Sequence, residues 1–452
     1  MKKNKMEMTE AQKHYDKMTK TPLTKLIVML GIPTTISMLV TNLYNMVDTY
    51  FVGTLGESQQ AATGILFTLQ AIIQAISFML GQGSGTMVSK SLAEQNSEEA
   101  SEYVSSAFFT ALEIGSIVTV GGLLFLTPLL RLLGSTETIL PYAKEYGICV
   151  LATAPIMIAS FVLNNNLRYE GKAFYAMIGL VSGSVINILG DYLFVIVFPL
   201  GVLGAGLATA MSQVVSFFIL LYFFLKKAQS KIKVSSISKN PSVYMTIFKV
   251  GFPAVIRQGL SSFSGGLLNN LTRPYGDAAI AAMSVVNRFS AFVMCVGLGI
   301  SQGYQPVASF NYQAKEYKRV KKGLLVTIAI GFCIITTMAI PGFIFAEEIV
   351  HLFQESEKVK EVGVFALRCS CVGVVFLAFS VPINMLYQSI RKAGMSSFLS
   401  LLRSGLMFIP TLLITTHFWG LTGIQISQPL ADILTGLTST PFIIMVLKKQ
   451  EF

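Results

Sequence analysis

Long apolar segments separated by short polar stretches follow one another along the chain. Twelve of them reach the roughly 20 residues that an α-helix needs to cross a bilayer. They span 23–53, 58–89, 98–126, 138–163, 173–197, 202–226, 243–273, 277–309, 318–345, 358–388, 396–417 and 421–447. In lipid a helix satisfies its own backbone hydrogen bonds. The pattern therefore predicts an all-α membrane protein with twelve transmembrane helices.

The second half of the chain repeats the first. Gly31-Ile32-Pro33 recurs 220 residues later as Gly251-Phe252-Pro253, and towards the end an offset of 219 places Gly201 on Gly420. Glycine and proline dominate these matches, as expected when two copies share one backbone. Each copy holds six spans, an even number, so both copies enter the membrane from the same side. We therefore expect two six-helix lobes related by a pseudo-two-fold axis along the membrane normal.

This organisation divides the chain into five parts. A cytoplasmic N-terminal tail (1–22) precedes the N-lobe (23–226), which holds the first six spans. A cytoplasmic linker (227–242) leads to the C-lobe (243–447), and a short cytoplasmic tail (448–452) ends the chain.

Charge is scarce and unevenly distributed. Charged residues make up 13% of the chain and hydrophobic residues 53%, with a formal net charge of +11. Basic residues gather on the side of both termini, whereas the opposite loops hold only Arg131, Arg273, Lys358 and Lys360. This is the positive-inside pattern. It predicts a multi-pass protein of the cell (cytoplasmic) membrane with both termini cytoplasmic, surrounded by the lipid bilayer and without a nucleic-acid partner.

Among the acids inside apolar segments of the N-lobe, two are the most informative. They are Asp48 and Asp191, and the repeat places Leu268 and Thr411 at the corresponding positions of the C-lobe. A carboxylate at membrane depth is costly and is by default a functional hypothesis. Asn187 lies one helical turn before Asp191 and shares its face. Two carboxyl groups with amide and hydroxyl oxygens suit a proton or Na⁺, so we expect Asp48, Asp191 and Asn187 to form a cation-coupling site.

Polar side chains at helical spacing on four N-lobe spans are expected to form a cavity with these acids. Such stripes must face one another or water when they lie in lipid. Besides Asn187 and Asp191, the stripes contain Thr41, Tyr44, Asn45, Gln70, Gln74, Tyr146 and Asn164. In the C-lobe, Arg257 and Ser261 are candidate cavity residues.

Other intramembrane charges have less specific interpretations. Glu113 is either a third cavity acid or faces a polar neighbour. Asp432 is expected to pair with a C-lobe arginine as a structural bridge. Those arginines are Arg257, Arg288, Arg368 and Arg403.

Catalytic and nucleotide-binding signatures are absent from the sequence. The three histidines form no cluster, and no Gly-x4-Gly-Lys-Ser/Thr motif occurs. We therefore expect an ion-coupled transporter and no enzyme, without a cofactor or structural metal beyond the coupling H⁺ or Na⁺.

Over essentially its whole length, the chain resembles the multidrug and toxic compound extrusion (MATE) family, and within it the MepA-like bacterial branch. The motifs that carry the resemblance are Gly31-Ile32-Pro33, the run from Asn45 to Gly53, Asn187-Ile188-Leu189-Gly190-Asp191, Gly201-Val202-Leu203-Gly204-Ala205, and the segment from Gln305-Pro306 to Asn311-Tyr312. The resemblance implies a twelve-helix, two-lobe antiporter, expected as a monomer, that exports amphipathic and typically cationic compounds in exchange for H⁺ or Na⁺. It implies N-lobe coupling through Asp48, Asn187 and Asp191, with Tyr44, Tyr146 and Asn164 lining the same cavity.

The chain departs from another branch of that family in the C-lobe. Ser261 stands where that branch carries a glutamate on the seventh helix, so a C-lobe cation site is not expected. The alternative function is a flippase of lipid-linked oligosaccharide or cell-wall precursor with a related fold. The arginines of the C-lobe favour this alternative, and the acidic N-lobe opposes it.

Overall fold

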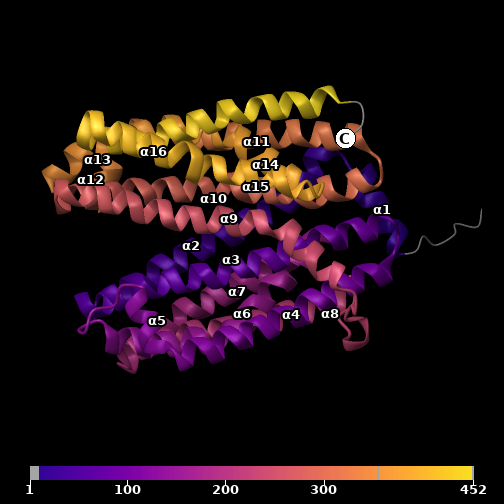
Figure 1. Ribbon diagram of the computed structural model, residues 1–452, viewed down its shortest axis with the longest axis horizontal. Coiled ribbons are helices and arrows are strands. Elements are labelled where there is room, and N and C mark those ends of the chain that lie inside the picture. Colours follow the sequence, from indigo (N-terminus) through magenta and orange to yellow (C-terminus); the bar gives the residue numbers. More distant parts are fainter. Residues whose placement is uncertain (1–9, 354–355, 450–452) are drawn as a thin grey trace, which may run out of the picture.

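The computed structural model describes residues 10–353 and 356–449, and helices make up nearly all of them (Figure 1). The first lobe contains long helices joined by short connections. These are α2 (Leu23–Gly53), α3 (Glu57–Ala93), α4 (Ser97–Leu124), α6 (Leu140–Tyr169), α7 (Ala173–Asp191), which continues as a π-helical turn (Tyr192–Val197), and α8 (Gly201–Lys227). The short helix α5 (Leu126–Leu132) lies between α4 and α6.

The second lobe repeats this order with two interruptions. Its helices are α9 (Pro241–Thr272), α10 (Asp277–Gln313), α11 (Tyr317–Ile344), the short α12 (Ala346–Phe353), α13 (Glu357–Val374), α14 (Leu377–Ser389), α15 (Ala393–Leu401), a π-helical turn (Leu402–Met407) and α16 (Phe408–Lys448). The axes of α13 and α14 are bent by 47°. Within α16, Gly420 takes a left-handed φ of 56°, which breaks the helix in two.

Length and hydropathy identify nine membrane spans in the described part of the chain, or ten when the bent pair α13 and α14 counts as one span. Two further spans, one from the division of a long run and one from α9, bring the number to the predicted twelve. The run Ala393–Lys448 is counted once, although Gly420 divides it. Helix α9 is long enough at 32 residues but carries Lys249 and Arg257, which lower its hydropathy. The predicted fold class, an all-α membrane protein with twelve spans, is confirmed.

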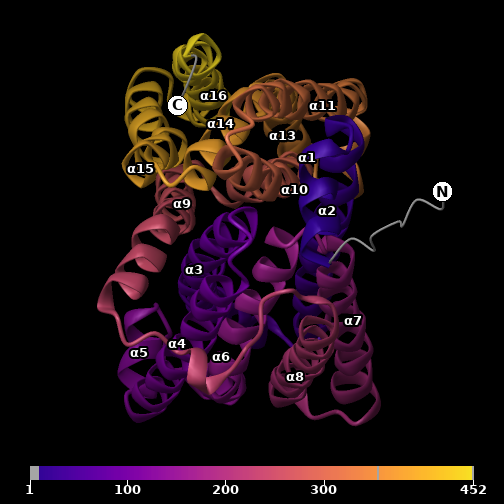
Figure 2. The same ribbon diagram turned by 90° about the vertical axis from the view of Figure 1, so that its right-hand side faces the viewer.

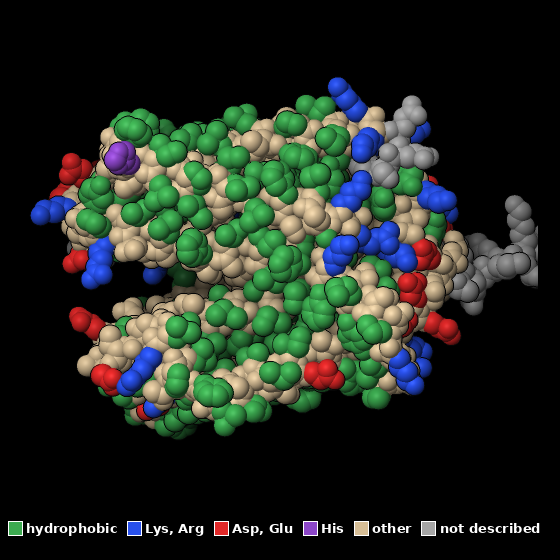
Figure 3. Space-filling view, viewed as in Figure 1, with side chains coloured by type: hydrophobic (Ala, Val, Ile, Leu, Met, Phe, Trp, Pro, Cys, Tyr) green, Lys and Arg blue, Asp and Glu red, His purple; other side chains and the backbone are tan. Residues whose placement is uncertain are grey.

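The two lobes meet along a four-helix interface. Helices α2 and α3 of the first lobe pack against α10 and α9 of the second. Figure 2 looks onto the end that carries α1 (Glu10–Lys20), where the lobes are in contact. At the opposite end, near α5 and α12, the space-filling view shows a hollow between the lobes (Figure 3). The molecule is therefore open at the α12 end and closed at the α1 end.

Glycines allow the close contact at the α1 end. A Cβ on Gly251 of α9 would overlap the Met79 carbonyl oxygen of α3, and one on Gly303 of α10 would overlap the backbone of Gly31 in α2. Gly31 and Gly251 are equivalent in the two halves of the chain. Gly31 and Gly251 thus mark positions where the two lobes come into close contact.

The N-terminal segment is more structured than expected from the sequence. Within the predicted tail 1–22, helix α1 lies across both lobes at the closed end (Figure 2). Its His14 Nε2 lies 2.9 Å from the Glu170 carbonyl oxygen in the first lobe. In the second lobe, the side-chain amide of Asn311 donates to the Met18 carbonyl at 3.1 Å. Met18 itself is fully buried, so α1 is a packed element that joins the lobes.

The linker between the lobes is held by one buried carboxylate. Glu170, just after α6, accepts hydrogen bonds from the backbone N–H of Gln229 at 2.6 Å and of Ser230 at 3.2 Å. The Ser230 hydroxyl donates to the same carboxylate. Burial raises the pKa of Glu170, although these donors favour its charged form. The linker thus packs as part of the α1 end.

Candidate functional site

The two acids predicted to couple the ion lie in one buried polar cluster. Asp48 of α2 is 2% exposed and Asp191, at the end of α7, is 0% exposed. The Tyr146 hydroxyl of α6 donates to Asp48 Oδ2 at 3.2 Å and lies 3.1 Å from the hydroxyl of Thr209 on α8. The side-chain amide of Asn187 donates to the same Thr209 oxygen at 3.2 Å. Four helices thus contribute to this acid cluster, which we define as Asp48, Tyr146, Asn187, Asp191 and Thr209.

Several acceptors of the acid cluster have no hydrogen-bond partner among the described residues. They are Asp48 Oδ1, Asn187 Oδ1 and both carboxyl oxygens of Asp191. Asp191 also lies within electrostatic range of Asp48. Buried polar atoms are normally hydrogen-bonded, and a group of unpaired ones calls for an explanation. Two neighbouring carboxyl groups here require protons or a bound cation, because two bare charges would repel each other in a medium of low polarity.

The chemistry of this oxygen set fits a small hard cation. Carboxylate, amide and hydroxyl oxygens all bind such ions, and a carboxyl group can also carry a proton. Asp48 and Asp191 have no basic residue as an ion-pair partner in residues 10–353 and 356–449. The cluster can therefore bind and release H⁺ or Na⁺ without first breaking a salt bridge.

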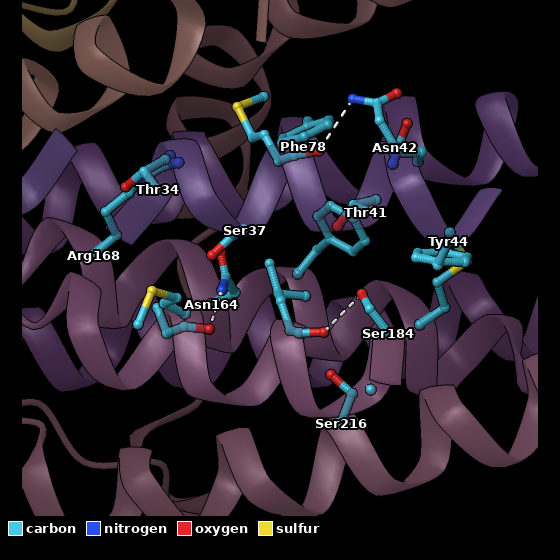
Figure 4. A pocket seen from close by; sticks show the side chains of 18 of the residues that line it. Thr34, Ser37, Thr41, Asn42, Tyr44, Phe78, Asn164, Arg168, Ser184 and Ser216 are labelled. Carbon is cyan, nitrogen blue, oxygen red and sulfur yellow. Dashed lines mark hydrogen bonds between the residues drawn. The ribbon is translucent and has the colours of Figure 1, made fainter. Parts of the chain in front are cut away.

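A cavity of about 220 Å³ lies beside the acid cluster, mostly inside the N-lobe. Five residues predicted from the polar stripes line it: Thr41, Tyr44, Asn45, Gln74 and Asn164. Figure 4 shows Thr34 and Arg168 towards one end and Tyr44 towards the other. The C-lobe contributes Gln258 of α9 and Gln302 of α10. Apolar side chains complete the lining, among them Met38, Phe78, Met157, Phe161 and Leu180.

The acids do not themselves line this cavity, contrary to the prediction of one shared polar pocket. Asp48, Asp191, Asn187 and Tyr146 are absent from its wall. Tyr44 connects the two sites, because it lines the cavity and lies within electrostatic range of both carboxyl groups. Helix α2 therefore presents its polar residues in two directions, which spacing along one helix does not reveal.

Gln70 is outside the cavity wall as well. It lies on α3 one turn before Gln74, which does reach the wall and accepts a 3.4 Å hydrogen bond from Gln258 of the C-lobe. Gln74 therefore lines the cavity, whereas Gln70, one helical turn away, does not.

One of the two C-lobe candidates, Arg257, lines a second, smaller cavity. This cavity has a volume of about 30 Å³, and Arg403 and Ser404 also line it. Ser261 is not in its wall. Its hydroxyl donates to the Arg257 carbonyl at 2.8 Å and lies 3.3 Å from the Ser404 hydroxyl. Ser261 therefore joins helices. Arg403 Nε is bound to Asp432 Oδ1 at 2.9 Å, the structural bridge expected from the sequence.

Glu113 is neither a third cavity acid nor paired with a polar neighbour among the described residues. It is exposed on the surface of α4 and lines none of the described pockets. No ion pair or side-chain hydrogen bond involves it among the described residues. It is an acid of the N-lobe that stands apart from the acid cluster.

Thr209 and Arg168 are among the site residues that the sequence analysis did not identify. Thr209 is the shared hydrogen-bond partner in the acid cluster. Arg168 was not among the candidate residues but lines the cavity. A signal for Thr209 exists, because Thr209, Ser212, Gln213 and Ser216 follow helical spacing and the last three line the cavity. Arg168 has no such signal, because it stands at the end of an apolar segment like many surface arginines.

Two lobes of six spans, a cavity between polar helix faces and buried acids in one lobe define a membrane transporter of the alternating-access type. A family model described as MatE matches residues 33–193 and again 253–414, once in each lobe. The chain belongs to this family, the MATE transporters, as the resemblance predicted.

Known proteins resemble the chain over nearly its full length. Multidrug export protein MepA of Staphylococcus saprophyticus is 25% identical over 436 residues, which cover 96% of this chain and 95% of that protein. MepA of Staphylococcus aureus strain MRSA252 is 26% identical over the same length and with the same coverage.

Solved structures agree with the fold. One, described as the outward-facing conformation of a multidrug resistance MATE family transporter of the MOP superfamily, matches with a TM-score of 0.91 and 26% identity, over 98% of this chain and 100% of that one. Another is a MOP superfamily transporter from Pyrococcus furiosus, whose description reports reverse polarity of its binding pocket. It matches with a TM-score of 0.89 and 27% identity, over 98% of this chain and 100% of that one.

Proposed function

We propose that this protein is a secondary active multidrug efflux transporter of the cell membrane. It exports amphipathic small molecules in exchange for H⁺ or Na⁺, by alternating access between its two lobes, and works as a monomer. Its MatE family and the multidrug export proteins that it resembles support this function. The residues that we assign to ion coupling are Asp48, Asp191 and Asn187.

The charge distribution supports an orientation with the α1 end in the cytoplasm. Basic side chains gather at that end of the space-filling view (Figure 3). They include Lys226 and Lys227 at the end of α8 and Lys448 at the end of α16. Lysine and arginine are retained on the cytoplasmic side of membrane proteins. In this orientation the hollow near α12 faces outward, and the described conformation is outward-facing.

The acid cluster is the single observation that carries the coupling mechanism. Its unpaired carboxyl oxygens offer a place for a proton or Na⁺, and Tyr44 stands between the acids and the cavity. A compound that enters the cavity changes the surroundings of Tyr44 and of the acids behind it. Ion binding and compound binding then influence each other, and this coupling is reciprocal.

The energy available from such an ion is sufficient for export. One elementary charge that moves through a membrane potential of ~100 mV releases ~2.3 kcal/mol. For an uncharged exported compound, so that each cycle moves one net charge, this corresponds to a roughly fifty-fold concentration ratio. A single ion per cycle therefore supports useful efflux.

The flippase alternative depends on basic residues in the C-lobe. Arg403 is neutralised by Asp432, and the C-lobe cavity measures only about 30 Å³ against about 220 Å³ for the N-lobe cavity. Both facts favour a small amphipathic compound over a large polyanionic headgroup.

Ethidium accumulation in cells that lack other efflux pumps tests the proposal. Cells with the wild-type protein should accumulate less ethidium than cells without it, and dissipating the proton or sodium gradient should abolish the difference. Asp48→Asn and Asp191→Asn should each accumulate ethidium like the empty cells. Glu113→Gln is the matched control, because it removes an N-lobe acid outside the acid cluster, and it should export normally.

Two outcomes would overturn the proposal. If both aspartate variants export ethidium as well as the wild-type protein at equal expression, Asp48 and Asp191 do not couple the ion. Flipping of a lipid-linked precursor in vesicles, with no movement of ethidium or another amphipathic dye, would favour the alternative function.

A further inference from the structure

The wall of the N-lobe cavity carries one charge, and it is positive. Of the residues that line this cavity, Arg168 is the only charged one. Asp48 and Asp191 stand behind the wall and do not contribute a carboxylate to it. A compound in the cavity therefore meets the Arg168 guanidinium directly, whereas no carboxylate lies in the cavity wall.

Arg168 is held in place by neutral partners. Only 3% of the residue is exposed. Its Nη2 donates to Asn165 Oδ1 at 2.6 Å, and its Nη1 donates to Gln302 Oε1 across the lobe interface. Its Nε has no hydrogen-bond partner in the described part of the chain, and no carboxylate there forms an ion pair with it. A buried charge without a counter-charge is costly, and an anion beside it recovers part of that cost.

A second guanidinium adds to the positive potential. Arg257 of α9 lies within electrostatic range of Arg168, and its buried Nη1 has no partner among the described residues. The next residue, Gln258, lines the same cavity as Arg168. Arg257 itself lines the separate C-lobe cavity, so it adds to the positive potential near Arg168 without lying in the wall of the N-lobe cavity. Figure 4 places Arg168, together with Thr34, at one end of the N-lobe cavity.

We propose that this end of the cavity is a subsite for an anionic group of the transported compound, a carboxylate in particular. The guanidinium of Arg168 binds the carboxylate, and the apolar body of the compound lies against Met157, Phe161 and Phe78. The inference rests on the proposed export function and specifies its substrates: amphipathic acids and zwitterions in addition to cations. A guanidinium suits a planar carboxylate because it presents several N–H donors in one plane.

Binding of two closely related dyes tests the subsite. One is a rhodamine with a free carboxylate, and the other is its methyl ester, which has the same ring system without that charge. Fluorescence anisotropy with purified protein in detergent measures the affinity of each dye without any ion gradient. The wild-type protein should bind the acid about tenfold or more tightly than the ester, as expected for a charge-assisted hydrogen bond.

Arg168→Gln should lose this preference and still bind the ester, and retained ester binding shows that the variant is folded. Glu113→Gln is the control and should keep the wild-type preference. Equal affinity of the wild-type protein for acid and ester would overturn the inference, and so would an unchanged preference in folded Arg168→Gln.

A competition experiment on the wild-type protein removes the dependence on a variant that could misfold. Benzoate should displace the acid rhodamine, whereas benzamide, its neutral counterpart, should displace it about tenfold less well. Equal displacement by the two compounds would overturn the inference. Because binding needs no gradient, these results are independent of whether Asp48→Asn and Asp191→Asn abolish export, so failure of the subsite and failure of the export function are distinguishable.

Discussion

Acidification is predicted to release helix α1 from the closed end of the protein. The perturbation is protonation of His14, which is 6% exposed. Burial lowers the pKa of His14 from 6.5 to about 4, and the nearby charges of Lys17 and Lys172 act in the same direction. A released His14 has the ordinary pKa, so it binds protons more tightly than docked His14. Docking is therefore complete above about pH 6.5 and weakens as the pH falls towards about 4.

The magnitude follows from this difference in pKa. Each pH unit below 6.5 costs docked α1 about 1.4 kcal/mol relative to the released helix. At about pH 5.5 the ratio of docked to released α1 is thus about tenfold lower than at neutral pH. The contacts that oppose release include the ring of Phe310, whose centroid lies 5.3 Å from that of His14 and 5.6 Å from that of Tyr15. Release frees both lobes at once, so it should also favour opening at the α1 end.

Double electron–electron resonance, which measures the distance between two spin labels, can follow the release of α1. One label replaces exposed Lys13 on α1 and the other replaces Lys322 on α11, in a protein whose exposed Cys333 is changed to Ser. The distance distribution should broaden as the pH falls from about 7.5 to about 5. His14→Gln is the control, because its amide can donate to the Glu170 carbonyl and does not titrate in this range. Equal pH dependence in His14→Gln and in the protein with His14 would refute this reasoning.

Two stability predictions concern contacts within the membrane. Gly251→Ala should lower the free energy of unfolding in detergent by about 1–3 kcal/mol, because the added Cβ overlaps the Met79 carbonyl oxygen; Gly259→Ala, with open space at its Cβ, should not. Equal thermal unfolding of the two variants would contradict this. Asp432→Asn should cost about 3 kcal/mol because it leaves Arg403 without its carboxylate, and adding Arg403→Met should recover much of the loss. No recovery in the double variant would contradict this.

The sequence predicts most of the fold because membrane spans follow from composition. The first span, 23–53, has the same bounds as α2, since a hydrophobic segment in lipid forms a helix whatever its other contacts. The repeat also carries backbone geometry. Gly201 and Gly420, which the repeat aligns, have left-handed φ values of 63° and 56°. Both mark the start of the sixth span of a lobe, where only glycine turns the chain without strain.

Tertiary packing determines what the sequence did not reveal. The segment around α1 is polar and lysine-rich, and an 11-residue helix is not stable alone in water. It forms here because Met18 and His14 are buried between the lobes. Spacing also placed Tyr44 and Asp48 on one face of α2, yet Tyr44 reaches the cavity and Asp48 lies behind it. That division depends on the positions of α6, α7 and α8, which no local pattern specifies.

Ion coupling by the acid cluster is the central claim, and equilibrium binding tests it most directly. The measurement is the dissociation constant of ethidium for purified protein across a range of pH and of Na⁺ concentration, without a membrane. The wild-type protein and Glu113→Gln should show an affinity that changes with pH or with Na⁺, by up to about tenfold per tenfold change of the coupling ion when one ion is exchanged. The double variant Asp48→Asn, Asp191→Asn should bind ethidium with an affinity independent of both. The same ion dependence in the double variant as in the wild-type protein would contradict the account.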